Sequence, residues 1–142
     1  QIVLSGKTDD LEKIIKILKN NSIKNIKLPV SAPFHCHLMD NATRIMTKEL
    51  NKLNFKNGKN KLISNVTASN IKDTNELKSL LIKQIENRVR WRESIVNMIE
   101  SDVNHFIEIG PGKVLSGLIK RINREVKINT INSQRDIENL KI

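Results

Sequence analysis

A loop histidine, His35, is the first residue in this sequence that could carry out chemistry. It follows an apolar stretch, lies two residues after Pro33, and precedes a run of helical periodicity. Loops at the ends of strands are where α/β folds place reacting groups. Imidazole titrates near neutral pH, so it can act as a general base and then as a general acid. A histidine at a loop-helix junction can also merely pack or cap, and taken alone the residue favours that interpretation.

A second candidate is the run Gly110-Pro111-Gly112-Lys113, between an expected strand and an expected helix. Glycines there permit a tight turn and a close backbone approach. The helix N-terminus could bind an anion. The run lacks the spacing and the Ser or Thr of a phosphate-binding P-loop. A structural turn is therefore the favoured interpretation.

The sequence offers few residues that could bind a metal ion or act as a thiol nucleophile. His35, Cys36 and His37 are adjacent, but the only other histidine is His105 and there is no CxxC pair, so no metal site is expected. Cys36 is a poor nucleophile candidate, because neighbours at a helix start point in different directions. A lone cysteine excludes an intrachain disulfide and fits a reducing cytoplasm.

The elements that must position these residues alternate between strand and helix. Residues 1–30 form a predicted β-α-β unit, with strands at 1–5 and 26–30 and a helix capped by Asp9 and Glu12. The alternation predicts an α/β fold with a mostly parallel sheet. A break near residues 29–33 divides a small part, 1–30, from a larger part, 31–142. Beyond it we expect strands at 62–66, 103–109 and 126–131, and helices at 38–53, 73–85, 94–100 and 114–122, with a short closing helix.

Composition narrows the class of protein. The chain has 142 residues, of which 38% are hydrophobic and 28% charged, as in a globular domain. It has neither an apolar run that could span a bilayer nor the order of a signal peptide, so we expect a cytoplasmic protein without membrane contact; the missing initial Met predicts further sequence upstream. Its net charge is +10, but its lysines are spread out and aromatics make up only 3%, which disfavours nucleic acid. An acidic protein or a phosphate-bearing substrate would suit the charge.

Five segments along the chain carry motifs that occur together in one protein family. Residues 28–39 (LPVSAPFHCHLM) and 108–118 (EIGPGKVLSGL) are the longest. The others are 1–6 (QIVLSG), 65–68 (NVTA) and 84–91 (QIENRVRW), the last with arginine where the family commonly has proline. In this order they resemble the malonyl-CoA:acyl-carrier-protein transacylases of bacterial fatty-acid synthesis.

The resemblance implies a two-step transfer of a malonyl group. A serine attacks the thioester of malonyl-CoA, and the acyl-serine then passes malonyl to acyl carrier protein, an acidic partner; no other cofactor is implied. His35 matches the histidine that takes the serine proton. Gln84 matches a position whose main-chain carbonyl orients that histidine. Asn65 lies near the same site by analogy. A phenylalanine directly before the histidine, as Phe34 is here, resembles the pattern of related acyltransferase domains that use malonyl groups.

Parts of the family's site are not in this sequence. The GQGSQ loop, the GHSLGE elbow with its serine, and the arginine that binds the malonyl carboxylate have no counterpart, and no GxSxG occurs. The family fold is an α/β-hydrolase-like core with a small ferredoxin-like lobe. Residues 1–30 match the second half of that lobe, and residues 31–142 match the C-terminal part of the core.

Three interpretations remain open. The chain can be part of an active transacylase whose other half lies on another chain or was removed. It can be a non-catalytic remnant of such an enzyme. It can also be a basic module that binds nucleic acid or protein. In the first two cases we expect the chain alone to be inactive.

Overall fold

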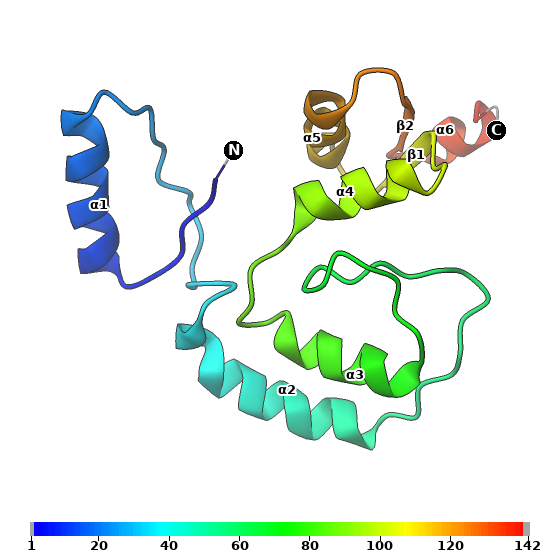
Figure 1. Ribbon diagram of the computed structural model, residues 1–142, viewed down its shortest axis with the longest axis horizontal. Helices are drawn as coiled ribbons and strands as arrows, with labels where there is room; N and C mark the ends of the chain where they lie inside the picture. The colour runs from blue at the N-terminus through cyan, green and yellow to red at the C-terminus, as the bar shows by residue number, and fades with distance from the viewer. Residues whose placement is uncertain (1, 141–142) are drawn as a thin grey trace. The chain divides into compact units, whose positions relative to one another are not determined.

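The computed structural model describes residues 2–140, and it divides into two compact units (Figure 1). The first unit is Gln1–Val89 and the second is Arg90–Ile142. This division does not coincide with the predicted boundary between residues 30 and 31. That boundary concerns a match to the family's lobes, so it stays a prediction.

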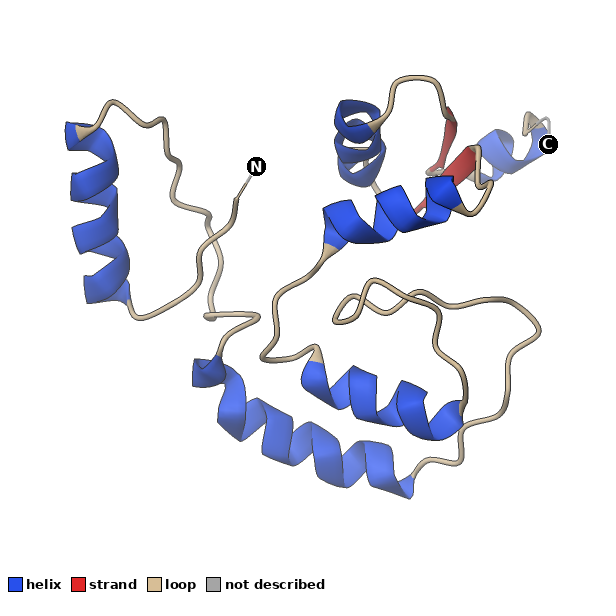
Figure 2. Ribbon diagram, in the orientation of Figure 1, coloured by secondary structure: helices blue, strands red, loops and turns tan. Residues whose placement is uncertain are grey.

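The first unit is helical where it is regular (Figure 2). Helix α2 packs against α3, and each helix has one buried residue, Leu50 in α2 and Leu80 in α3. Helix α1 buries none of its residues. The expected helix after His35 is confirmed, with a single 3-10 turn, η1, at its start. The elements are α1 (Thr8–Asn20), η1 (His37–Met39), α2 (Asp40–Lys52) and α3 (Thr74–Lys83).

The sequence predicts two caps in this unit, by Asp9 with Glu12 and, at the same spacing, by Asp73 with Glu76, and one of them is present. The Asp73 carboxylate accepts the N–H groups of Asn75 and Glu76, both at 2.8 Å, and so caps α3 as expected. Helix α1 has no side-chain cap and begins at Thr8. Asp9 therefore lies inside its first turn, and the predicted capping by Asp9 is wrong. There its charge can still interact favourably with the helix dipole.

Three predicted strands are wrong for the residues that the structure describes. Residues 2–7 and 23–30 have no regular secondary structure, and Gln1 lies outside the described residues. The expected strand at 62–66 is reduced to one isolated antiparallel bridge between Ile63 and Asn70. A strand persists only when its backbone groups pair with a neighbour. Alternating side chains predict which residues would share a face, but they cannot supply the partner.

The second unit contains the parallel pairing that the alternation predicts. Strand β1 (His105–Ile109) pairs in parallel with β2 (Lys127–Ile131), and helix α5 (Val114–Ile122) connects them. The unit is completed by α4 (Trp91–Glu100) and α6 (Gln134–Glu138). Its core consists of Ile95, Ile119 and Val126. Helix α4 begins three residues earlier than expected, because Trp91 packs against this core.

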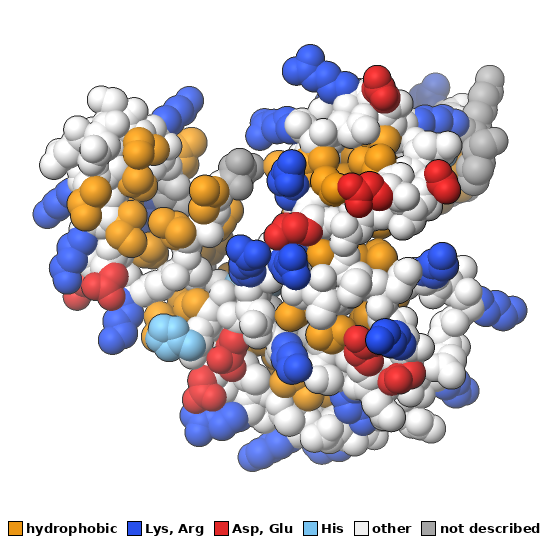
Figure 3. All heavy atoms as spheres, viewed as in Figure 1, with side chains coloured by type: hydrophobic (Ala, Val, Ile, Leu, Met, Phe, Trp, Pro, Cys, Tyr) orange, Lys and Arg blue, Asp and Glu red, His pale blue; other side chains and the backbone are white. Residues whose placement is uncertain are grey.

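Charged side chains are scattered over the visible face and do not form one basic patch (Figure 3). Ion pairs such as Arg44–Asp40 at 3.0 Å join neighbours on one helix or at its start. Arg90–Glu93 is partly buried, and the other three pairs are largely exposed. Exposed pairs of this kind contribute little to stability. No helix in the described part of the chain combines the length and the apolar character that crossing a membrane requires.

Candidate active site

His35 is held at the C-terminal end of helix α3. Its backbone N–H donates to the carbonyl of Ile85 at 3.2 Å. Its ring atom Nδ1 lies 2.9 Å from the carbonyl oxygen of Gln84 and 3.2 Å from that of Asn87. The last carbonyls of a helix have no partner within the helix, so they are free to accept from elsewhere. The resemblance predicted the Gln84 carbonyl contact, and the structure contains it.

These contacts determine which nitrogen of the ring carries the proton. A carbonyl oxygen can only accept, so Nδ1 must be the donor of the His35 ring. In the neutral ring the lone pair is then on Nε2, for which we find no hydrogen-bond partner among residues 2–140. The residue is exposed. Such a ring is arranged to accept a proton at Nε2, as a general base must.

Two further predicted residues lie beside His35. The Asn65 side chain donates through Nδ2 to Oε1 of Gln84 at 3.3 Å, so Asn65 is one residue removed from the histidine. Phe34 precedes His35 and leaves 49% of its surface exposed. Its backbone N–H donates to the carbonyl of Ala32 at 3.0 Å. Selection of a malonyl group by Phe34 stays a prediction.

Sequence reasoning missed Asn87 and Ile85, whose carbonyls also hold His35. Both lie within residues 84–91, which the family motif covers. Their main-chain role has no side-chain signature. The only available signal was the end of the predicted helix at residue 85, since carbonyls become free there.

The Gly110-Pro111-Gly112-Lys113 run forms a structural turn. The Glu108 carboxylate accepts the N–H groups of Leu115 at 3.1 Å and Ser116 at 2.7 Å, which occupies the N-terminus of α5. The Ser116 side chain foremost, and then these two amides, lower the pKa of Glu108. The backbone N–H of Gly112 donates to Asn132 Oδ1 at 2.6 Å. The anion site considered from the sequence is therefore filled by the protein itself.

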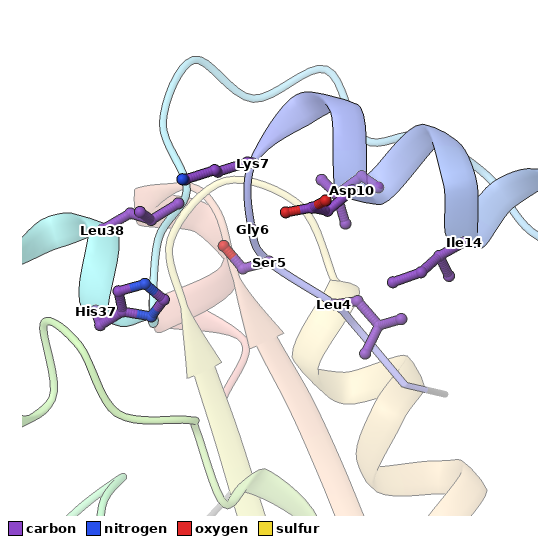
Figure 4. A pocket seen from close by; sticks show the side chains of 9 residues that line it. Leu4, Ser5, Gly6, Lys7, Asp10, Ile14, His37 and Leu38 are labelled. Carbon is purple, nitrogen blue, oxygen red and sulfur yellow. The ribbon is translucent and has the colours of Figure 1, made fainter.

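Cys36 and His37 point to neither a dyad nor a metal site. The Cys36 thiol donates to the carbonyl of Pro33 at 3.2 Å and lies 3.8 Å from the Ser5 hydroxyl. His37 lines a half-open hollow of about 410 Å³ together with Ser5, Lys7 and Leu38 (Figure 4). Within residues 2–140 no three His, Cys, Asp or Glu side chains gather as a metal would need.

Known proteins resemble this chain in both sequence and structure. No protein-family model matches the sequence. The malonyl CoA-acyl carrier protein transacylase of Bacillus subtilis (strain 168) is 40% identical over 139 residues, which are 97% of this chain and 44% of that protein. The crystal structure of the acyl-carrier-protein-S-malonyltransferase from Bartonella henselae is 38% identical, with a TM-score of 0.88 over 94% of this chain and 43% of that one. This chain matches the C-terminal portion of the malonyl CoA-acyl carrier protein transacylase family.

The transacylase relatives confirm the α/β fold and the family resemblance drawn from the motifs. They are acyltransferases, and the chain spans less than half the length of the relatives it matches. One similar structure is a type II PKS acyl-carrier protein in complex with its malonyl-transacylase. That transacylase is 29% identical, with a TM-score of 0.88 over 94% of this chain and 43% of its own.

Proposed function

We propose that this chain supplies the histidine side of an active site that transfers malonyl from coenzyme A to acyl carrier protein. The observation that carries the proposal is the ring of His35. Two carbonyls, those of Gln84 and Asn87, accept hydrogen bonds from the protonated Nδ1 and leave Nε2 free to act. The nucleophilic serine and the arginine for the malonyl carboxylate would come from the N-terminal portion of a transacylase.

Each half of the reaction moves one proton onto Nε2 and then off it again. As the serine oxygen bonds to the thioester carbonyl carbon, its proton passes to Nε2 of His35. The carbon–sulfur bond then breaks, and the coenzyme A sulfur leaves with that proton. In the second half the thiol of the carrier protein gives its proton to Nε2 and attacks the acyl-serine. The serine oxygen leaves and takes the proton back. No cofactor beyond the thioester substrate is required.

The partner of the first unit, on this proposal, is the remaining transacylase polypeptide. Ile2 and Ile26 leave 87% and 77% of their surfaces exposed, and they lie in extended segments that have no strand neighbour among the described residues. Apolar exposure of this extent beside unpaired backbone suits the addition of further strands. Residues 1–30 would then complete a ferredoxin-like lobe, and residues 31–142 would belong to an α/β-hydrolase-like core.

The second partner, acyl carrier protein, is proposed from the relatives and from charge. The structure of a similar transacylase is known in complex with its acyl-carrier protein. The net charge of this chain is +10, which would attract an acidic protein over a long range. Malonyl-CoA and acyl carrier protein suit a cytoplasmic enzyme, so a cytoplasmic location is part of the proposal.

A chimera tests the proposal directly. The C-terminal portion of the B. subtilis transacylase is replaced by this chain, and malonyl transfer to carrier protein is measured. We expect an active enzyme. His35→Ala should lower kcat/KM by about 10²–10⁴-fold, because that is the usual contribution of a general acid-base group.

The matched control is His37→Ala, which removes a nearby exposed histidine. Among the described residues the hydrogen bonds to the Gln84 and Asn87 carbonyls come from the His35 ring. His37→Ala should leave kcat/KM close to that of the parent chimera. A chimera that folds and forms no malonyl-serine would overturn the proposal and favour a non-catalytic remnant. If the chimera is active and His35→Ala leaves its kcat/KM unchanged, the proposed role of His35 is wrong.

A further inference from the structure

Gln84 takes part in the site through both its main chain and its side chain. Its main-chain carbonyl accepts from Nδ1 of His35 at 2.9 Å. Its side-chain oxygen Oε1 accepts from Nδ2 of Asn65 at 3.3 Å. The family resemblance assigns a role only to the carbonyl, which any residue could provide. The side-chain contact gives a reason for this position to be an amide.

The end of α3, which carries that carbonyl, is held by backbone bonds of unequal length. The helix finishes at Lys83, and Gln84 is its C-cap. The bonds from Gln84 N–H to Leu80 and from Asn87 N–H to Lys83 are 3.0 Å long, whereas those from Ile85 N–H to Ile82 and from Glu86 N–H to Lys83 are 3.3 Å long. None of these bonds involves the Gln84 carbonyl, and helix ends fray easily. An anchor outside the helix would hold the last turn in place.

The loop that carries Asn65 is built to be such an anchor. Ser64 and Ala68 are almost fully buried, with 5% and 1% of their surfaces exposed. Their backbones are joined by a bond of 2.8 Å from Ala68 N–H to Ser64 C=O, and Ser64 N–H donates to Ser69 at 3.0 Å. The Ser64 hydroxyl accepts from Val66 N–H at 3.1 Å. Asn65 therefore extends from a closed turn whose backbone has little freedom.

We propose that Asn65 is a positioning residue: by holding the Gln84 side chain, it keeps the Gln84 carbonyl on Nδ1 of His35 and so selects the ring tautomer with Nε2 free. The inference rests on the proposed function for its biological meaning. Its physical content concerns the ring alone, because the tautomer exists whether or not any malonyl group is transferred.

The test measures which ring nitrogen of His35 carries the proton, and it does not depend on enzyme activity. Two-bond ¹⁵N–¹H spectra of the histidine-labelled chain, or of the chimera if the chain alone is insoluble, report the proton on each ring nitrogen. The spectra are taken well above the ordinary pKa of histidine, so that the rings are neutral. Asn65→Ala should lower the ratio of the Nδ1–H to the Nε2–H form of His35 by about threefold to tenfold, as expected from one lost hydrogen bond. Asn70→Ala, in the same loop region, should leave the ratio unchanged.

Two more variants separate positioning from folding. Gln84→Met keeps the length of the side chain and removes the amide, so it should lower the ratio as Asn65→Ala does. The double variant should show no further loss, because both changes break the same contact. Asn65→Asp should restore the ratio, since the Gln84 amide can rotate and donate to the carboxylate.

An unchanged ratio in either Asn65→Ala or Gln84→Met, with His37 signals like those of the parent showing that the first unit is folded, would overturn the inference. Additive losses in the double variant would overturn it as well. If the chimera transfers no malonyl while the tautomer ratio still changes as expected, that result supports the positioning role of Asn65 and contradicts only the proposed function.

Discussion

His35 has a backbone φ of 61°, in the left-handed region that residues with a side chain rarely adopt. Such a conformation costs roughly 1–2 kcal/mol and persists only where the surroundings impose it. Here the surroundings are the carbonyls of Gln84, Ile85 and Asn87. Ala68, in the loop that carries Asn65, has a similar φ of 58°. Backbone strain is thus found at the histidine and at its proposed anchor.

The turn before α5 allows a prediction at the same scale. Gly112 has a φ of +91°, and a Cβ added there would meet no atom within 4 Å. Gly112→Ala should therefore lower the free energy of unfolding by about 1–2 kcal/mol through backbone strain alone. Gly117 lies inside helix α5 in equally open space. Gly117→Ala should raise the free energy of unfolding by about 0.5–1 kcal/mol. Urea unfolding measures both, and changes of the same sign would contradict this account.

At the scale of elements, side chains from neighbouring segments determine where several helices begin. Asp73 caps α3 from its own loop, and Ser133 with Asp136 forms a capping box at α6. Helix α5 is different, because its free N–H groups are bound by Glu108 from strand β1. This contact connects the strand to the helix that follows it. The Glu108 carboxylate therefore joins the two ends of the turn between β1 and α5.

The Glu108 contact predicts a pH dependence of stability. Its pKa in the folded protein is lowered from the ordinary 4.5, chiefly by the Ser116 side chain and then by the Ser116 and Leu115 amides. A lowered folded pKa means that the ionised carboxylate stabilises the fold above the unfolded pKa. That contribution is lost as the pH falls through the folded pKa. Glu108→Gln should lower the melting temperature at neutral pH, and its difference from the parent should shrink in acid.

Thermal unfolding from neutral pH down to about pH 3 measures this difference across the window in which carboxylates titrate. Glu100→Gln, at the exposed end of α4, is the matched control. It should change the melting temperature little at any pH. A constant difference between Glu108→Gln and the parent over the whole range would show that the charge of Glu108 does not stabilise α5.

At the scale of the whole molecule, apolar surface is left uncovered. The second unit has a small core around Ile95, and the first unit has few fully buried side chains. Several apolar residues of the first unit are instead more than half exposed, among them Ile2, Val3, Ile26 and Val30. Contiguous apolar exposure favours association. The relatives are more than twice as long as this chain, since it spans 44% of the B. subtilis protein.

Residues 1–142 expressed alone should therefore self-associate and bind a hydrophobic dye. The N-terminal portion of the B. subtilis transacylase, added in trans, should reduce both effects. Ile26→Lys, at a side chain that is 77% exposed, should make the isolated chain more soluble and weaken its binding to that portion. Ile137→Lys, at a side chain 59% exposed on α6, is the control and should leave binding intact. Light scattering and pull-down measure the two properties, and equal effects of both variants would contradict the assigned surface.

Patterns local in sequence predicted much of this structure. Helical periodicity indicated α2, α3 and α5, because an α-helix makes its hydrogen bonds within one segment. Strands β1 and β2 were also predicted, and they pair with each other across a single helix. The segments at 1–5 and 26–30 carry the same alternation without a partner in the described chain, so they form no ladder. The sequence thus indicated which segments could be strands, whereas pairing decided which of them are.

The candidate site divides in the same way. Motifs in order along the chain were sufficient to select His35, Gln84 and Asn65. Only the tertiary structure placed the His35 ring on carbonyls 49 and 52 residues away in sequence, because main-chain acceptors leave no mark on residue type. The Asn65–Gln84 contact and the Glu108 cap are likewise contacts between separate segments. Residue types determined which side chains could carry out chemistry, and folding determined which nitrogen of His35 is hydrogen-bonded and which is left free.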